Sequence, residues 1–102
     1  MWVIKRSTLL MFAADEPGAL QPLRHWYRVV RAAQWRSFAD VRRLFTTADL
    51  VRVASGRSVI VFDIAGNKYR LIAHASYHKQ KVYVLRVMTH REYDLDRWKR
   101  DL

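Results

Sequence analysis

Residues 89–94, Thr-His-Arg-Glu-Tyr-Asp, place an imidazole, a guanidinium, two carboxylates and a phenol within one short stretch. They directly follow the largely apolar run 82–88, which its β-branched residues predict to be a strand. Side chains at the end of a strand are held rigidly enough for chemistry. Since an imidazole titrates near neutral pH, His90 is the first candidate for proton transfer, with the phenol of Tyr93 beside it.

Groups of this kind on a basic surface are the parts needed to cleave RNA without a metal ion. A base takes the proton of the ribose 2′-OH, the alkoxide attacks the adjacent phosphorus, and an acid protonates the leaving 5′ oxygen. Cations stabilise the charge that develops on the phosphoryl oxygens, and a guanidinium matches their geometry. A basic strand with one histidine is also typical of proteins that bind RNA without cutting it, so the residues alone leave both functions open.

Other common kinds of site are absent from the sequence. Its three glycines form no phosphate-binding loop, and its four histidines show no metalloprotease spacing. There is no cysteine, which excludes disulfides, thiolate metal sites and a cysteine nucleophile. We therefore expect neither a metal ion nor another cofactor.

Length and charge narrow the class of protein. A chain of 102 residues, 51% of them hydrophobic, predicts one domain over residues 1–102. A net charge of +10 and a pI near 10.7 predict a phosphate-rich or acidic partner, with an inert basic surface as the alternative. The basic pair Lys5-Arg6 follows the first apolar run instead of preceding it, and no run is long enough to span a membrane. We expect a cytoplasmic protein.

The N-terminal half has the apolar periodicity of helices. Leu9–Ala14 predicts a short helix with Ser7 as its N-cap, ended by a Pro-Gly pair. Leu20–Gln34 predicts the clearest helix, with an apolar stripe on one side and arginines on the other. Ser37 and Asp40 have the spacing of a capping box before a third, short helix.

The other runs predict strands, with one further helix at the end. In chain order the strands are 1–4, one near 50–53, then 59–64, 69–75 and 82–88. The Gly66-Asn67 pair indicates a hairpin. Residues 95–102 predict a short amphipathic helix with Trp98 on its apolar side. Helices gathered before an antiparallel meander predict an α+β fold.

Three segments together resemble the HigB family, a branch of the RelE-like toxins of bacterial toxin–antitoxin systems. They read Gly-Asn-Lys-Tyr-Arg-Leu-Ile (66–72), Val-Tyr-Val-Leu-Arg (82–86) and Thr-His-Arg-Glu-Tyr-Asp (89–94). The helical segments 23–27 and 35–37 are also similar. The resemblance implies a small α+β domain whose N-terminal strand and helices pack on an antiparallel sheet. It also implies an mRNA endoribonuclease that acts on messages in the ribosome and is silenced by a cognate helix-turn-helix antitoxin, similar to HigA.

The same resemblance assigns roles to individual residues. Arg70 matches an arginine that these toxins use on the scissile phosphate, and His90 lies where the superfamily often has a basic residue. Tyr93 would orient the nucleotide, while Lys68 and Arg91 would contact phosphates. We expect neither the phosphate-facing Arg70 nor the strand-exit His90 to belong to the core.

One departure from the family pattern affects proton transfer. The strand before the hairpin carries several lysines in the strongest RelE-type ribonucleases, but here it reads Val-Ile-Val-Phe-Asp (59–63). Proton transfer would then depend on His90, on Tyr93, or on charge stabilisation by ribosomal RNA. Structural alternatives remain open for two arginines. Arg70 could pair with Asp63 across the hairpin, and Arg86, a further candidate RNA contact, could pair with Glu92 or an acidic partner. His74 and His78 are expected at the surface, and Tyr69 and Tyr83 in packing.

Two other functions remain open. The first is a basic module that binds RNA or an acidic protein without catalysis. The second is a DNA-binding protein that uses the arginine-rich helices between Arg24 and Arg43. We rank it last because the helical stripe holds many large apolar residues, and the loop after Gln34 does not resemble a tight helix-turn-helix joint.

Overall fold

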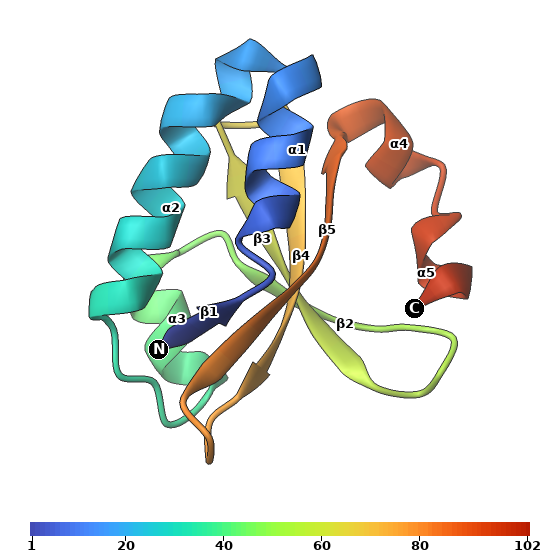
Figure 1. The fold of residues 1–102 in the computed structure, drawn as a ribbon. Helices are drawn as coiled ribbons and strands as arrows, with labels where there is room; N and C mark the ends of the chain where they lie inside the picture. Colours follow the sequence, from blue (N-terminus) through green and yellow to red (C-terminus); the bar gives the residue numbers. More distant parts are fainter.

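The computed structural model describes residues 1–102 and is built on a five-stranded sheet of order β1-β5-β4-β3-β2 (Figure 1). The strands are β1 (Trp2–Ile4), β2 (Asp49–Arg52), β3 (Ser58–Ile64), β4 (Tyr69–Ser76) and β5 (Lys81–Thr89). Strands β2 to β5 form the predicted antiparallel meander. β1 is an edge strand, as predicted, but it pairs in parallel with β5, so the sheet is mixed. The α+β class is confirmed.

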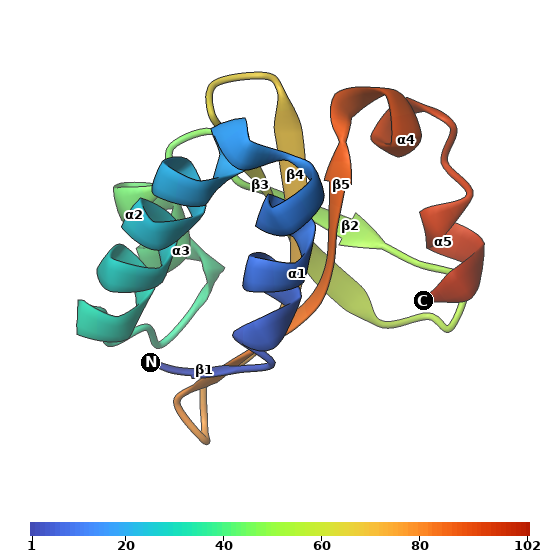
Figure 2. The ribbon, with the colours of Figure 1, turned by 45° about the horizontal axis from the view of Figure 1, so that its top comes forward.

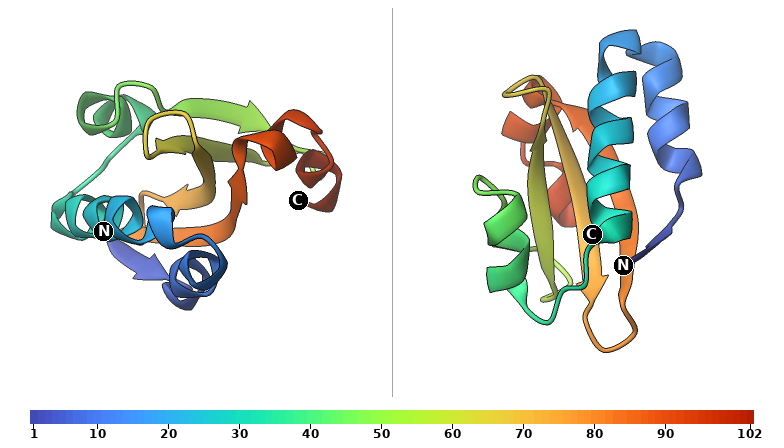
Figure 3. Two further views of the ribbon diagram at one scale, coloured as in Figure 1. Left: turned by 90° about the horizontal axis from the view of Figure 1, so that it is seen from above. Right: turned by 90° about the vertical axis from the view of Figure 1, so that its left-hand side faces the viewer.

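Helices cover the two faces of this sheet unequally. They are α1 (Ser7–Asp15), the 3₁₀ turn η1 (Pro17–Ala19), α2 (Leu20–Ala32), α3 (Phe38–Leu44), α4 (His90–Asp94) and α5 (Trp98–Asp101). α1 and α2 lie along one face, whereas α4 and α5 stand on the other side of β5 (Figures 2 and 3). None of the helices combines the length and apolar character that crossing a membrane requires.

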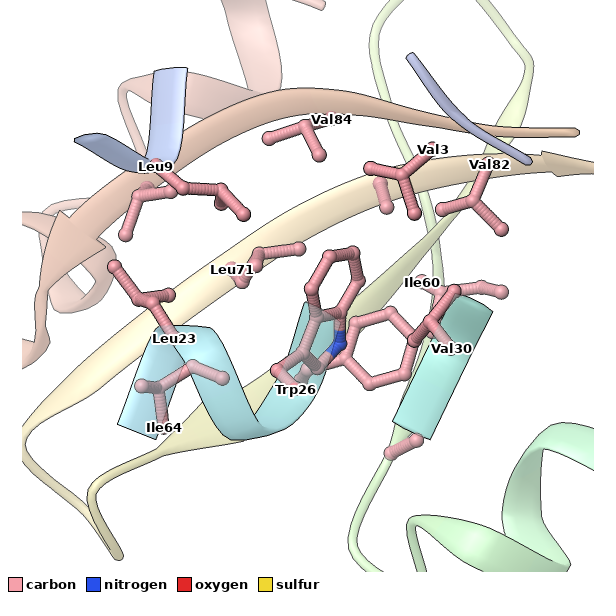
Figure 4. Packing of buried hydrophobic residues seen from close by; sticks show 14 of the residues in the cluster. Val3, Leu9, Leu23, Trp26, Val30, Ile60, Ile64, Leu71, Val82 and Val84 are labelled. Atoms are coloured by element: carbon pink, nitrogen blue, oxygen red, sulfur yellow. The ribbon is translucent and has the colours of Figure 1, made fainter. Parts of the chain in front are cut away.

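The larger core lies between α2 and the sheet. Leu23, Trp26 and Val30 of α2 are almost fully buried and point at residues of β3, β4 and β5 such as Leu71 (Figure 4). The apolar stripe predicted for this helix is therefore its packing face. A smaller cluster lies on the opposite face of the sheet: Val53, Val59, Val61, Ile72, Met88 and Trp98. Because side chains alternate along a strand, Arg70 of β4 belongs to this second face together with Ile72.

Helix caps differ from their predicted places. Ser7 is the first residue of α1 and not its N-cap. Ser37 does precede α3 but makes no capping bond, and the side chain of Asp40 accepts a hydrogen bond from the backbone N–H of Arg36 (2.9 Å). The capping box of this protein forms at Thr89, which starts α4 directly at the end of β5. A helical turn thus begins where the sequence indicated only the exit of a strand.

The turn between β3 and β4 occupies residues 65–68. Ala65 (φ 55°) and Gly66 (φ 67°) both have left-handed backbones, which glycine adopts freely and alanine only with strain. The turn places Asp63 directly opposite Arg70 in the sheet register. It therefore brings an acidic and a basic side chain together at the end of the sheet where α4 begins.

Candidate active site

The candidate residues converge where β5 ends and α4 begins, beside the turn between β3 and β4. Tyr69 of β4 lies opposite Thr89 of β5 in the sheet register, so Arg70 is one residue from this end of the sheet. The backbone N–H of His90 donates a hydrogen bond to the carbonyl of Lys68 (2.9 Å). This bond ties the start of α4 to the turn.

Arg70 is held by the protein on nearly all sides. Its Nε lies 3.1 Å from Oδ1 of Asp63, and Nη1 donates to the carbonyls of Asn67 (3.3 Å) and Tyr69 (3.1 Å). Nη2 donates to the side-chain oxygen of Asn67, which leaves one N–H of Nη2 without a protein acceptor. The residue is only 7% exposed, so the expectation that it lies outside the core is wrong. The structural pair with Asp63 is formed because the two strands place these residues opposite each other.

Tyr93 is half-buried between aromatic and cationic neighbours. Its ring stacks on Trp98, with centroids 5.3 Å apart and planes 19° apart, and Cζ of Arg70 lies 5.3 Å from its centroid. Burial raises the pKa of Tyr93 above the ordinary tyrosine value, although the positive charge of Lys99 acts in the opposite direction. A phenol with a raised pKa stays protonated at neutral pH, so it can donate a hydrogen bond or a proton but is a poor base.

His90 makes its contact on one turn of α4. Its Nε2 lies 3.0 Å from Oδ2 of Asp94, the residue four positions later, and its side chain is 42% exposed. The other ring nitrogen, Nδ1, is buried and has no hydrogen-bond partner. Nε2 is therefore the nitrogen that can meet a ligand, in exchange for Asp94. As expected, His90 is not a core residue.

The remaining predicted cations differ in whether they are paired with an acidic side chain. Lys68 and Arg91 are exposed, and neither forms an ion pair. Nη1 of Arg86 lies 3.1 Å from Oδ2 of Asp101, so the suggested pair with Glu92 is wrong. Glu92 instead completes the capping box of α4. Arg86 does belong to an acidic contact, but with a residue of α5.

A small hollow of about 180 Å³ lies between β5 and the C-terminal helices. Its lining residues are Arg86, Met88, Glu92, Leu95, Arg97, Trp98 and Asp101. Strand β3 contributes no cation to this side of the sheet, because its residues there are Val59, Val61 and Asp63. No group of three or more histidine, aspartate or glutamate residues could hold a metal ion.

Three residues around the site were not assigned to it from the sequence. Asp94 contacts His90, and its i,i+4 spacing on a helix was the available signal. Asn67 holds Arg70 with both its carbonyls, a contact that nothing in a turn sequence predicts. Trp98 is on the apolar side of its helix, as predicted, but its stacking on Tyr93 depends on how the chain folds back after α4.

Comparison with known families gives a match over most of the chain. Residues 19–96 match the HigB toxin family, which is described as the RelE-like toxic component of a toxin–antitoxin system. The matched segment contains every candidate site residue from Lys68 to Tyr93, while β1 and α1 lie outside it.

Curated relatives match over a shorter segment. The chain is 47% identical over 34 residues to the mRNA interferase toxin HigB of Escherichia coli strain K12, and equally to the mRNA interferase HigB of E. coli O157:H7 and of Shigella flexneri. The aligned segment spans 33% of this chain and 33% of each of these relatives.

Proposed function

The chain belongs to the HigB family of RelE-like toxic components of toxin–antitoxin systems, and from this we propose that it is an mRNA interferase. Residues 1–102 would act as one domain that cuts translated messages on the ribosome in the cytoplasm and so inhibits translation. The observation that carries this proposal is the cluster of His90, Tyr93 and Arg70 at the end of the sheet, inside the matched segment.

The proposed reaction is metal-independent attack of the ribose 2′-OH on the adjacent phosphorus. Nε2 of His90 leaves Asp94 and takes or returns a proton, which the exposure of this nitrogen's side of the ring supports. The protonated phenol of Tyr93 donates to the RNA and is the second candidate acid. Because the ring of Tyr93 already contacts Trp98 and Arg70, we assign the contact with the nucleotide to its hydroxyl.

The cations divide into a fixed and a free set. Arg70 supplies a positive charge beside Tyr93, with one N–H left for a phosphoryl oxygen. Lys68 and Arg91 are free to contact flanking phosphates, and Arg86 becomes available if RNA replaces Asp101. We expect charge stabilisation to come from these groups and from ribosomal RNA, since β3 provides no lysine.

The proposed partners follow from the family and from the charge. A toxic component needs an antitoxin, and we expect a HigA-like protein with a helix-turn-helix domain, encoded next to this gene. A chain with a net charge of +10 would otherwise bind nucleic acids indiscriminately.

Induced expression in a bacterial host tests the proposal. Growth should stop, and primer extension should map cuts within translated messages. A message without a start codon should stay intact, and so should all messages when His90→Ala is expressed to the same level. Intact messages and normal growth with the wild-type protein would exclude the interferase and favour a basic module that binds RNA or protein without catalysis.

A further inference from the structure

A row of polar residues crosses the sheet at the end opposite to the candidate active site. His74 of β4 and Tyr83 of β5 lie directly opposite each other, and their rings are 6.2 Å apart with a 34° tilt. Lys5, which follows β1, and Arg57, which precedes β3, flank this pair. These side chains, with Val84 and Leu85, line a hollow of about 250 Å³.

The row lies on the same face of the sheet as the active-site arginine. Residues at even spacing along a strand share a face, and the one irregularity in the pairing adds a residue to β5 and not to β4. Arg70 and His74 therefore point to the same side, separated by four residues, or roughly 13 Å of strand. Ile72 lies between them on this face and is fully buried in the cluster that includes Trp98 of α5, so RNA that reaches both residues must pass over the C-terminal segment.

The chemistry of the row fits single-stranded nucleic acid. Aromatic rings offer a stacking surface for any base, and cations beside them track the backbone. His74 and Tyr83 are partly exposed, while Lys5 and Arg57 are exposed. No ion pair in the structure includes either cation. The row is thus not neutralised by the protein, in contrast to Arg70.

We propose that His74 and Tyr83 form a stacking subsite for a base of single-stranded RNA, with Lys5 and Arg57 on the flanking phosphates. This subsite rests on the proposed function, because it extends the track of the RNA that the active site would cut. It assigns a ligand contact to two aromatic residues whose types alone indicate only surface and packing positions.

The test measures binding separately from cleavage. The probe is a short fluorescent single-stranded RNA with 2′-O-methyl riboses, which has no 2′-OH to attack, and the readout is fluorescence anisotropy with the full chain. Tyr83→Ala and His74→Ala should each weaken binding by about 5- to 150-fold, whereas Tyr83→Phe should bind like the wild type because stacking needs only the ring. Replacing both Lys5 and Arg57 with Gln should lower the slope of log K against log salt by about 1.4, or about 0.7 for each phosphate contact.

Matched controls remove an imidazole and a guanidinium from helix α2, away from the row. His25→Ala and Arg28→Gln, both at exposed positions of α2, should bind RNA like the wild type.

The subsite is wrong if Tyr83→Ala and His74→Ala are folded, as judged by circular dichroism, and bind RNA as tightly as the wild type. If they lose the antitoxin but keep RNA, the row is a protein interface and the subsite is equally wrong. If the wild-type protein does not bind the RNA probe, the subsite is also wrong. If these variants lose RNA binding but the wild-type protein leaves messages uncut in the cell, the subsite is supported and the interferase is rejected.

Discussion

Arg70 has the chemistry of a phosphate ligand, yet its first partners belong to the protein itself. Its contacts with Asp63, Asn67 and the backbone join the two ends of the hairpin, and its charge faces the ring of Tyr93. Removing a buried guanidinium that is satisfied in this way leaves its partners unpaired, so the fold depends on Arg70 in addition to any role with RNA. Stability and activity must therefore be measured together at this position.

Replacing Arg70 should destabilise the protein. Arg70→Ala leaves Asp63 and three carbonyl oxygens, two of Asn67 and one of Tyr69, without their donor. This should cost about 2–4 kcal/mol and lower the melting temperature by on the order of 10 °C or more. Arg70→Lys keeps the charge but not the fork, so its loss should be intermediate. Arg91→Ala is the matched control, and should stay within about 0.5 kcal/mol because Arg91 is exposed and unpaired. A wild-type melting curve for Arg70→Ala would mean that these contacts contribute nothing.

Replacing His90 should affect cleavage and not folding. His90→Ala should lower single-turnover cleavage on a programmed ribosome by about 10²- to 10⁴-fold, the range for loss of one proton-transfer group. Asp94→Ala leaves the imidazole in place and frees Nε2, so its effect should be smaller. His25→Ala controls for the loss of an exposed imidazole. Cleavage at the wild-type rate by His90→Ala would make Tyr93 the candidate acid.

Tyr93 predicts a stability change at alkaline pH. Its pKa in the folded protein is raised, first by burial, so folding disfavours the phenolate. Its contribution to stability is then complete below the unfolded tyrosine pKa of about 10 and is lost as pH rises through the folded pKa. Melting temperatures from pH 8 to 11 should fall less steeply for Tyr93→Phe than for the wild type. Parallel curves would show that burial of this hydroxyl has no such effect.

Among the elements, α4 has its position fixed by a capping box, which starts the helix directly at the end of β5. The hydroxyl of Thr89 accepts from the backbone N–H of Glu92, and the carboxylate of Glu92 reaches back to Thr89. α4 has only five residues and would be marginal alone. The cap therefore sets the direction in which His90 leaves the sheet.

Thr89→Ala should loosen this helix. Loss of an N-cap side chain costs about 0.5–2 kcal/mol, and cleavage should fall as well because His90 loses its fixed position. Ser37→Ala is a matched control: Ser37 precedes α3 but makes no capping bond, so its removal should leave both melting and cleavage near the wild type. Equal effects of the two changes would mean that the cap has no special role at the site.

How much of the structure the sequence predicts depends on the length and regularity of each element. The apolar patterns of α2, β3, β4 and β5 predicted the ends of these elements to within two residues. They did so because each element buries one or both of its faces, which requires apolar residues at regular positions. The parallel pairing of β1 joins segments far apart in the chain, and no local pattern encodes it. For α4, the Thr-x-x-Glu spacing was present in the sequence but lay within a run interpreted as the exit of a strand.

The sequence predicted which residues belong to the candidate site better than it predicted how they are arranged. The register that sets Asp63 opposite Arg70 was open as an alternative, since a hairpin of this length permits it. The burial of Arg70 was not predictable, because it requires the C-terminal segment to return over the sheet and bring Trp98 and Tyr93 together. Contacts between elements joined by a short irregular loop are a property of the whole fold.

At the scale of the whole molecule, charge is the dominant property. The chain has nineteen lysines and arginines but only nine acids. Six ion pairs engage five of these acids, because Asp40 belongs to two pairs; the five are Asp40, Asp63, Asp94, Asp96 and Asp101. A sixth acid, Glu92, is used by the capping box of α4. Few acids remain to screen the free cations. An external acidic partner is therefore expected to do so.

The complex with the antitoxin should weaken as salt rises. Attraction between a cationic toxin and acidic residues of its partner acts over a Debye length of about 10 Å at 0.1 M salt and about 3 Å at 1 M. Copurification of the chain with the product of an adjacent helix-turn-helix gene would supply the complex, and titration calorimetry at several salt concentrations would give its affinity. We expect both a lower affinity and a slower association at high salt, because complementary charge acts strongly on the rate of encounter. An affinity that stays flat from low to high salt would show that apolar contacts hold the complex, and that the free cations serve RNA alone.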